Sequence, residues 1–470
     1  MVFSSSVFLF LFLPLFLGLY YVTPFRYRSA VILLGSYSFY AWWRVDFLAL
    51  FIAVTLWNYI IAIRIDGAAS ALIKKRWLTL GIVGNLSTLG YFKYANFGVD
   101  SINALLVEMG ANPLALGNVI LPIGISFYIF QAISYLVDVY REDTPPTKRF
   151  IDFAAFIALF PQLIAGPVLR YKDLADQFEY RTHTYAKFSE GASRFMQGFI
   201  KKVFIADTIA PIADFAFGSS DPSMADAWLG AIVYAIQLYF DFSGYSDMAI
   251  GLGLMMGFRF PENFNQPYIS QSITEFWRRW HISLSSWLRD YLYIPLGGSR
   301  GGELFTYRNL FLTMLLGGLW HGANWTFVLW GVWHGGWLAV ERALGIKPGG
   351  PFIFTRWIFC LFLVLMGWVL FRATDVSEAL RMYSAMFGAS EIGLSVDMAL
   401  SISTLQIITI GIAVAVIVVH SMRIRVFNFD RFKVSRRGAA VLLAAQVPLF
   451  VLSVSKLIAS SYSPFLYFQF

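Results

Sequence analysis

The sequence predicts an all-α integral membrane protein that crosses the membrane many times. Hydrophobic residues make up 58% of the 470 positions, whereas charged residues make up only 14%. Soluble domains carry about 25% charged residues, so this chain lacks the polar side chains needed to cover its own surface. Apolar runs of near membrane-spanning length also recur along the chain. Soluble multidomain enzymes, disordered proteins and fibres are therefore excluded, and residues 1–470 are expected to form a single membrane domain.

An apolar stretch near the start, Val7–Val22, is predicted to be an uncleaved first span. A secretory signal peptide carries Lys or Arg before its apolar core and small residues at a cleavage site after it. No basic residue precedes this stretch, and Arg26 and Arg28 follow it. We therefore expect the stretch to begin outside and the two arginines to lie on the cytoplasmic side.

Thirteen further apolar runs are predicted to be helices, and several are shorter than the roughly 20 residues of a simple span. Short or interrupted segments at membrane depth are tolerated only inside protein or beside water. The short runs therefore suggest re-entrant or buried helices around a central cavity. The runs are Ser29–Trp43, Phe47–Ile63, Trp77–Phe92, Ile120–Val139, Phe150–Leu169, Phe195–Phe215, Ala227–Phe240, Ser246–Gly257, Leu310–Leu319, Trp325–Leu344, Phe352–Leu370, Ser401–His420 and Ala439–Leu457.

Basic residues exceed acidic ones by 36 to 28, which gives a net charge of +8. In a membrane protein such an excess orients loops toward the cytoplasm, so no nucleic-acid partner is expected. Four basic clusters are predicted to be cytoplasmic: Lys74–Arg76, Arg141–Arg149, Lys201–Lys202 and Arg423–Arg437. The last cluster is expected to touch anionic lipid headgroups. The single cysteine, Cys360, lies in an apolar run and is predicted to be a buried apolar residue.

The middle of the chain differs from the rest, because ionisable residues are interleaved with aromatic ones over residues 239–302. Ionisable side chains in or near a membrane are unfavourable there, so they usually line a functional interior. We therefore expect the catalytic core at about residues 239–340.

Two histidines in this core are candidate proton carriers, because imidazole gains and loses protons near neutral pH. His321 ends an apolar run between Gly318 and Gly322, and these glycines are expected to leave room for a substrate beside the ring. A packed histidine bonded to a backbone carbonyl is the alternative. The G-x-x-x-G spacing of the two glycines also fits close helix packing.

The second candidate, His281, follows two arginines. Arg278 and Arg279 offer positive charge to an anionic acyl donor, although the pattern alone favours a position at the membrane surface. Structural roles are predicted for two histidines in or beside apolar runs, and a loop position for a third. These residues are His334, His420 and His183, respectively.

Several other chemistries lack their sequence pattern. The segment from Gly244 to Met248 misses the last glycine of a hydrolase nucleophile elbow. No phosphate-binding loop is present, and the glycines from Gly251 to Gly257 have one residue too many for a dinucleotide-binding turn. Cysteine and histidine do not occur with the spacing of a zinc site. No metal is therefore expected.

The segments W-R-R-W-H-I-S-L-S at residues 277–285 and L-W-H-G-A-N-W at residues 319–325 resemble motifs of the membrane-bound O-acyltransferase family. Two further segments, at residues 239–258 and 289–298, resemble its bacterial branch, which includes D-alanyl transferases of teichoic acid and O-acetyltransferases of polysaccharides. Three more segments are most similar to family members that acetylate alginate. They are residues 1–14, 40–51 and 160–178. The similarity covers nearly the whole chain.

This resemblance implies a fold, a reaction and a location. The fold is a ring of transmembrane helices around a central funnel, with the histidine pair where the protein is thin. The reaction is acetyl transfer to periplasmic alginate from a cytoplasmic donor, expected to be the substrate acetyl-CoA, with no bound cofactor. The location is the bacterial inner membrane, among its lipids, with periplasmic alginate-acetylation proteins as partners.

The family's two histidines fall on His321 and His281 of this sequence. We expect His321 to act as the general base and His281 to act as its positioning partner or as an oxyanion donor. Tyr245, Asp247 and Asn324 are expected to orient the histidines or to contact substrate.

Two functions without chemistry stay open at this point. Interrupted, charged helices also occur in transporters and flippases, although the inverted repeats of many such proteins are not found here. A structural secretion subunit would fit the hydrophobicity but would leave both histidine motifs unexplained. The O-acetyltransferase hypothesis accounts for both motifs.

Overall fold

The computed structural model describes residues 2–388, 390–421 and 436–459. Within these ranges every regular element is a helix and no strand occurs, so the predicted all-α class is confirmed. The chain divides into two compact units. Unit 1 comprises Met1–Glu190 and Leu252–Pro261, and unit 2 comprises Gly191–Gly251 and Glu262–Phe470. The single membrane domain stays a prediction.

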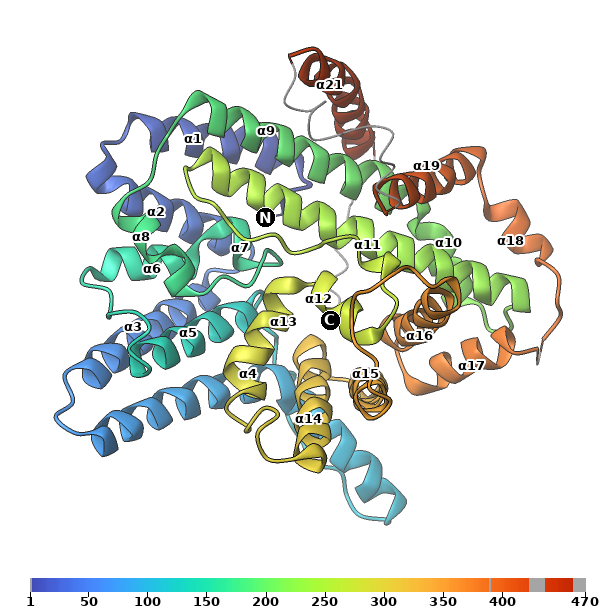
Figure 1. The fold of residues 1–470 in the computed structure, drawn as a ribbon, viewed down its shortest axis with the longest axis horizontal. Helices are drawn as coiled ribbons and strands as arrows, with labels where there is room; N and C mark the ends of the chain where they lie inside the picture. Colours follow the sequence, from blue (N-terminus) through green and yellow to red (C-terminus); the bar gives the residue numbers. More distant parts are fainter. Residues whose placement is uncertain (1, 389, 422–435, 460–470) are drawn as a thin grey trace. The chain divides into compact units, whose positions relative to one another are not determined.

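Unit 1 holds the first eight α-helices and the start of a ninth. They are α1 (Leu13–Val22, preceded by the π-helical turn η1, Phe8–Phe12), α2 (Arg28–Ala41), α3 (Asp46–Asp66), α4 (Ala71–Glu108), α5 (Ile125–Tyr140), α6 (Phe150–Ala158), α7 (Phe160–Leu163), α8 (Tyr171–Glu179) and α9 (Tyr185–Phe199). Helices α3, α4 and α5 pack against one another (Figure 1). Asn58 of α3 and Asn85 of α4 donate to each other's side-chain oxygens at 2.9 and 2.7 Å. This buried pair satisfies two amides that would otherwise destabilise an apolar interface.

Unit 2 begins within α9 and contains the remaining described helices, except that Leu252–Met255 at the end of α11 belong to unit 1. They are η3 (Ile200–Ala206, π-helical), α10 (Asp207–Gly218), α11 (Met224–Met255), α12 (Ile273–Arg279), α13 (Ile282–Leu288), η5 (Arg289–Tyr293, π-helical), α14 (Glu303–His321), α15 (Trp325–Ala343), α16 (Phe354–Arg372), α17 (Val376–Met386), α18 (Val396–Ser401), α19 (Thr404–Ser421) and α21 (Arg436–Ala459). Helices α14 and α15 form an antiparallel pair, and α16 packs against α15. This trio and α11 position the candidate site.

Four predicted runs illustrate how helix limits in the structure differ from those expected. Ala227–Phe240 and Ser246–Gly257 are not separate short helices but parts of α11, which has 32 residues. Leu310–Leu319 lies inside the 19-residue α14. In contrast, Phe150–Leu169 divides into α6 and α7, with a break at Leu159 (φ −50°, ψ 100°). Pro161 follows that break, and proline favours the first turn of a helix because its missing N–H needs no partner there.

Charge pairing explains why α11 continues through its polar middle. Lys202 on η3 has a side chain that is 1% exposed and forms ion pairs with Asp241 of α11 (2.8 Å) and with Asp207 (2.5 Å). Lys201 pairs with Asp247 of α11 at 2.7 Å. The charges of Asp241 and Asp247, which lie near the junction of the two predicted apolar runs, are therefore balanced by lysines of η3. Both lysines of the Lys201–Lys202 cluster face these carboxylates, and its cytoplasmic location stays a prediction.

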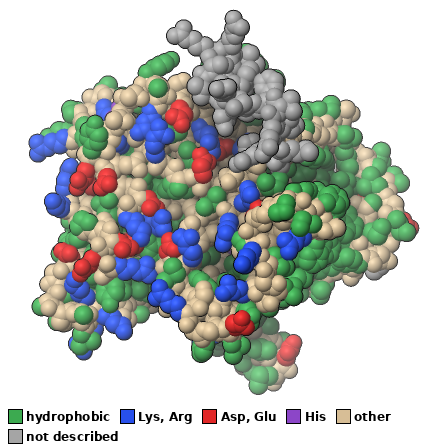
Figure 2. Space-filling model, in the orientation of Figure 1, with side chains coloured by type: hydrophobic (Ala, Val, Ile, Leu, Met, Phe, Trp, Pro, Cys, Tyr) green, Lys and Arg blue, Asp and Glu red, His purple; other side chains and the backbone are tan. Residues whose placement is uncertain are grey.

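Within the described ranges, two helices are by themselves long and apolar enough to cross a membrane, α3 and α16. Four shorter apolar segments occur at α1, α5, α19 and α21. Large hydrophobic side chains are exposed on α16 and α19, and Figure 2 shows such side chains over wide areas of the displayed face. The Arg423–Arg437 cluster, predicted to be cytoplasmic, lies outside the residues whose side chains the structure describes.

Candidate active site

His281 lies at a sharp bend between two short helices. Helix α12 ends at Arg279, Trp280 is extended, and α13 begins at Ile282. His281 itself has φ 44° and ψ 54°, the left-handed conformation that non-glycine residues rarely adopt. Such a conformation persists only where the surroundings enforce it, and it recurs at functional sites.

The start of α12 is fixed by a carboxylate from another helix. Glu341 of α15 accepts hydrogen bonds from the backbone N–H groups of Ile273 (2.5 Å) and Thr274 (2.9 Å) and from the Thr274 hydroxyl. The hydroxyl of Ser272 caps the same end by accepting from the N–H of Glu275. A negative charge at a helix N-terminus also complements the helix dipole. The segment that carries His281 is therefore held firmly against α15.

Asn263 orients the His281 ring and was not predicted from the sequence. Its side-chain oxygen accepts from the backbone N–H of Ser283 (3.2 Å), from the Ser283 hydroxyl (2.8 Å) and from His281 Nδ1 (3.1 Å). Its amide nitrogen donates to the Ser246 hydroxyl at 3.0 Å. Because a backbone N–H fixes the orientation of the amide, Nδ1 of His281 is assigned as the protonated nitrogen. Neutral His281 then carries its lone pair on Nε2.

His321 is the last residue of α14, directly before the extended Gly322. The predicted use of its flanking glycines, to admit a substrate, is wrong. A Cβ on Gly318 would collide with the backbone oxygen of Phe327, and one on Gly322 would collide with the Phe327 ring. The glycines instead let α14 and α15 approach closely, with Gly331 of α15 opposite Gly318.

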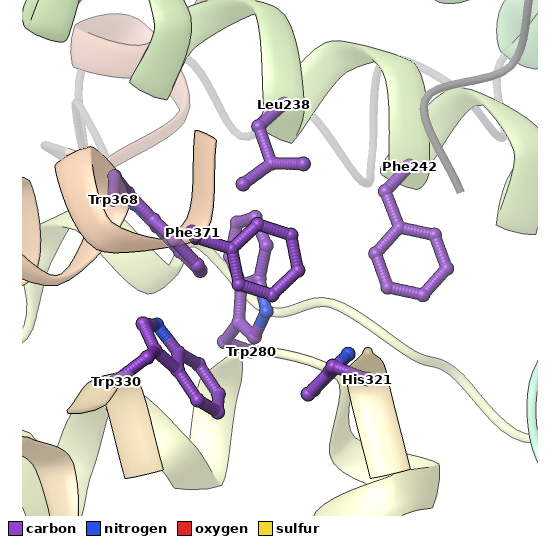
Figure 3. Close-up of a pocket in the computed structure, with 7 residues that line it drawn as sticks. All are labelled: Leu238, Phe242, Trp280, His321, Trp330, Trp368 and Phe371. Atoms are coloured by element: carbon purple, nitrogen blue, oxygen red, sulfur yellow. The ribbon is translucent and has the colours of Figure 1, made fainter. Parts of the chain in front are cut away.

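The His321 ring borders a narrow pocket between closely packed side chains. Figure 3 shows its seven lining side chains converging from four helices and from the bend at His281. Apart from His321, the lining consists of aliphatic and aromatic side chains. They are Leu238 and Phe242 of α11, Trp280 of the bend, Trp330 of α15, and Trp368 and Phe371 of α16. An imidazole in such surroundings acts where little water is present, and electrostatic interactions are stronger there.

Both predicted histidines contact this group of rings. Phe242 lines the pocket with His321, and its ring meets the His281 ring edge-on at a centroid distance of 4.7 Å. Trp320 lies 6.3 Å from the His281 ring and 5.1 Å from the His321 ring. The structure therefore brings together two histidines that are 40 positions apart in the sequence.

A second feature missed by the sequence analysis is the Trp330 indole N–H. Its ring lies 5.0 Å from the His321 ring, nearly perpendicular to it. The indole nitrogen is buried and finds no hydrogen-bond acceptor within the described part of the chain. Buried donors are almost always paired, so such an exception calls for an explanation. A tryptophan in an apolar helix gives no sequence signal of this kind.

The two arginines beside His281 occupy different environments. Arg279 forms an ion pair with Glu275, one turn earlier in α12, at 2.9 Å, and donates to the Asn265 carbonyl. Arg278 is exposed, and none of the described residues pairs with it. Only Arg278 therefore presents its charge to the outside without an intramolecular counterion.

The other predicted site residues have contacts of their own. Asn324 caps α15 by accepting from the Thr326 N–H, and it donates to the Thr374 carbonyl. Asp247 forms ion pairs with Lys201 and with Arg194 (2.7 Å). Their hydrogen bonds described here involve neither histidine. Tyr245 is buried within α11.

The remaining histidines lie outside the pocket lining. His334 is fully buried on α15 against Trp277 and Trp330. His183, in unit 1, follows α8, and its Nε2 lies within hydrogen-bond distance of the Tyr20 hydroxyl (2.9 Å) and the Met256 carbonyl (3.1 Å). The side chain of His420 lies outside the described residues.

Comparison with known proteins extends these observations. A family model described as MBOAT, membrane-bound O-acyltransferase family, matches residues 119–345, which include both histidines. The probable alginate O-acetylase AlgI of Azotobacter vinelandii is 60% identical to this chain, with 100% of both chains covered. The chain belongs to the membrane-bound O-acyltransferase family. The predicted resemblance is thereby confirmed.

More distant MBOAT relatives share only part of the chain. The peptidoglycan O-acetyltransferase of Helicobacter pylori is 38% identical over 84% of this chain and 81% of its own. The teichoic acid D-alanyltransferase of Bacillus subtilis is 30% identical over 44% of this chain and 55% of its own. These similarities establish an O-acyltransferase, and more narrowly a membrane O-acetyltransferase, among membrane proteins of this family.

Proposed function

We propose that this O-acetyltransferase takes acetyl groups from acetyl-CoA on the cytoplasmic side of the bacterial inner membrane for the acetylation of alginate on the periplasmic side. Five relatives named probable alginate O-acetylase are 56–60% identical over the full chain, and they support this acceptor. In this proposal the chain is multi-pass, its helices form a ring around a funnel, and periplasmic acetylation proteins complete the transfer.

The pocket beside His321 is the observation that supports the chemistry. A ring nitrogen of His321 takes the proton of the acceptor hydroxyl, while the hydroxyl oxygen attacks the acetyl carbonyl carbon. The carbon–sulfur bond of the thioester then breaks, and the departing thiolate takes up the proton. A positioned base contributes about 10²–10⁴-fold to such a step. The apolar lining limits water, which would otherwise compete for the acetyl group.

We assign three supporting roles to surrounding residues: positioning of the site, oxyanion binding and donor binding. With its proton on Nδ1, neutral His281 does not donate from Nε2, so we assign it positioning of the site rather than oxyanion binding. The indole N–H of Trp330 is the better oxyanion donor, because it lies beside His321 and lacks another acceptor among the described residues. Arg278 is assigned to the phosphates of the donor, because its charge is exposed and unpaired in the described chain.

The transporter alternative receives no comparable support. A polysaccharide carries many hydroxyls, and each would need a polar partner along a path through the protein. The pocket near His321 offers one imidazole among six apolar side chains. This lining suits a small acyl group better than a sugar polymer.

Replacing His321 with Ala tests the proposal. The variant should accumulate normally in the membrane, while ester acetyl per uronic acid falls at least about 10²-fold and polymer yield stays constant. His334→Ala is the matched control, and it should retain acetylation when corrected for membrane abundance. Reduced polymer export with normal acetylation would support a transporter instead. Full acetylation in a stably expressed His321→Ala strain would end the catalytic assignment.

A further inference from the structure

One segment of unit 1 departs from the rest of the fold because nothing in it is buried. Residues 94–121, here called the α4 extension, comprise the last part of α4 and the chain that returns toward α5. No residue between Tyr94 and Leu121 is buried, whereas α4 before this point packs against α3 and α5. In Figure 1 the end of α4 reaches well beyond both of these helices.

Two asparagines fasten the returning chain to the helix. Asn96 donates to the Val119 carbonyl at 2.8 Å and accepts from the Val119 N–H at 3.1 Å. Asn103 makes the same pair of bonds with Leu114, at 3.1 and 2.6 Å. The asparagines are seven residues apart, which is two helical turns, so both point to one side of α4. The extension is therefore held in one conformation although it lacks a buried core.

Its outward surface is strongly apolar. Leu105 is 62% exposed and Met109 is 80% exposed, and because they are four residues apart they share one face of α4. Val107, on another face, is 62% exposed, and Leu114 and Leu116 of the returning chain are also exposed. Exposed apolar side chains that share a helix face mark a site of interaction. Because the extension is already fixed, little conformational entropy would be lost when a partner binds.

Length and charge place this surface on the side opposite the cytoplasm. Lys74–Arg76 marks the cytoplasmic end of α4, and a span of about 20 residues from Trp77 ends near Asn96. The following residues to Glu108 then extend about 18 Å further. No Lys or Arg occurs from Tyr94 to Tyr140. This placement rests on the membrane topology in the proposed function.

We propose that the α4 extension is the docking surface for a soluble periplasmic protein that presents an apolar patch bordered by Lys or Arg. The charge of the extension points to this partner, because Asp100 and Glu108 are its only ionisable acidic or basic groups. A segment that lies on a membrane surface carries Lys or Arg for anionic headgroups, and this one has none. A second copy of the chain would bring like charges together.

Photo-crosslinking in living cells tests which partner is present. A photoreactive amino acid placed at Leu105 or Met109 should form an adduct with a soluble periplasmic protein. The adduct should disappear when Asp100→Lys and Glu108→Lys are added, because the basic border would then be repelled. A matched control at Leu80, exposed on the spanning part of α4, should give lipid adducts only. Adducts at Leu105 and Met109 with lipid alone, with a second copy alone, or with nothing would overturn the proposal.

A functional measurement separates docking from chemistry. The combined variant Leu105→Ser, Val107→Ser and Met109→Ser should lower ester acetyl per uronic acid about tenfold, as expected for the loss of several interface anchors. The same variant, purified and supplied with a soluble hydroxyl acceptor, should release CoA from acetyl-CoA as the unaltered protein does. Wild-type acetylation of the polymer by the variant would overturn the docking surface. Failure of the unaltered protein to release CoA would overturn the proposed function, and the crosslinking result would still decide the docking surface.

Discussion

At the scale of single residues, the indole N–H of Trp330 is expected to stabilise the oxyanion, and this role can be tested. Trp330→Phe keeps an aromatic ring in the pocket but removes the indole N–H. If this group stabilises the oxyanion, its loss should lower kcat about 10²–10³-fold with little change in KM. The measurement is CoA release by purified protein, with a soluble hydroxyl acceptor present, at saturating and at limiting acetyl-CoA.

Trp333→Phe is the matched control on the same helix. The Trp333 indole donates to the Leu363 carbonyl at 2.9 Å, away from the pocket lining. Its removal should lower stability by about 1 kcal/mol, the contribution of an ordinary hydrogen bond, and leave kcat unchanged. Equal kcat for Trp330→Phe and the unaltered protein would remove Trp330 from the mechanism.

The neighbouring arginines give a second residue-scale prediction. Arg278→Gln should raise the apparent KM for acetyl-CoA and leave kcat nearly constant, because an exposed cation contributes to donor binding and not to the chemical step. The effect should shrink at high salt, since exposed charges are screened. Initial rates against acetyl-CoA concentration, at low and high salt, provide the measurement.

Arg279→Gln serves for comparison, because its charge is already engaged by Glu275. It should change KM less than Arg278→Gln does. An unchanged KM in the Arg278→Gln variant would return that residue to the membrane-surface role that its sequence pattern favours.

Some site residues could be predicted from the sequence because they stand in recognisable local motifs, and others could not. His281 and His321 stand in local motifs, so their positions were available before any fold was known. Asn263 lies in an irregular segment, 18 residues before the histidine that it orients, and no periodicity or spacing links them. Gly318 was interpreted wrongly for a related reason. A small residue beside a histidine suggested open space for a substrate, whereas the backbone of α15 occupies that space.

At the scale of helices, the contact between α14 and α15 determines the position of His321, the last residue of α14. Gly318→Ala places a methyl group against the Phe327 backbone and should force the helices apart. Overpacking of this kind destabilises by about 1–3 kcal/mol, and it should also displace His321 and lower activity. Thermal unfolding in detergent and CoA release by the same preparation are the measurements.

Gly336→Ala on α15 is the matched change, because nothing lies within 4 Å of its added Cβ. Alanine is also the better helix former, so this variant should unfold at the same or a higher temperature and keep its activity. Equal behaviour of the two variants would show that the close approach at Gly318 does not determine the position of His321.

Helix positions were largely predictable, whereas helix ends were not. Apolar runs locate helices because both burial and lipid contact require a chain whose backbone bonds are satisfied internally. Asp241 and Asp247 interrupt such a run in the sequence, yet α11 passes through both. Their partners Lys201 and Lys202 lie on η3, and only the folded chain brings the two helices together. A single run of residues does not show which distant charged residues will pair with it, so the continuation of α11 could not be predicted.

At the scale of the whole molecule, the predicted orientation of the chain can be measured with cysteine labelling. Cys360 is buried, so background reaction should be low. In spheroplasts a membrane-impermeant thiol reagent should label Asn112→Cys, in the α4 extension. It should label Lys75→Cys and Ser435→Cys only after the membrane is opened, because basic clusters favour the cytoplasmic side.

The three positions test independent parts of that orientation. Asn112 and Lys75 lie toward opposite ends of α4, and Ser435 belongs to the Arg423–Arg437 cluster outside the described residues. Labelling of Ser435→Cys in intact spheroplasts would contradict the assignment of that cluster. Labelling of Asn112→Cys only after opening would place the α4 extension in the cytoplasm and remove the basis of its proposed partner.

The left-handed backbone of His281 has a consequence for how this position can change over evolutionary time. Histidine there carries strain of about 1–3 kcal/mol, and glycine would relieve it because it lacks a Cβ. The backbone conformation alone would therefore favour glycine. The imidazole opposes this preference, because it donates to Asn263 and packs against Phe242, and its loss would leave a cavity. The bend between α12 and α13 is therefore a place where backbone conformation and side-chain contacts favour different residues.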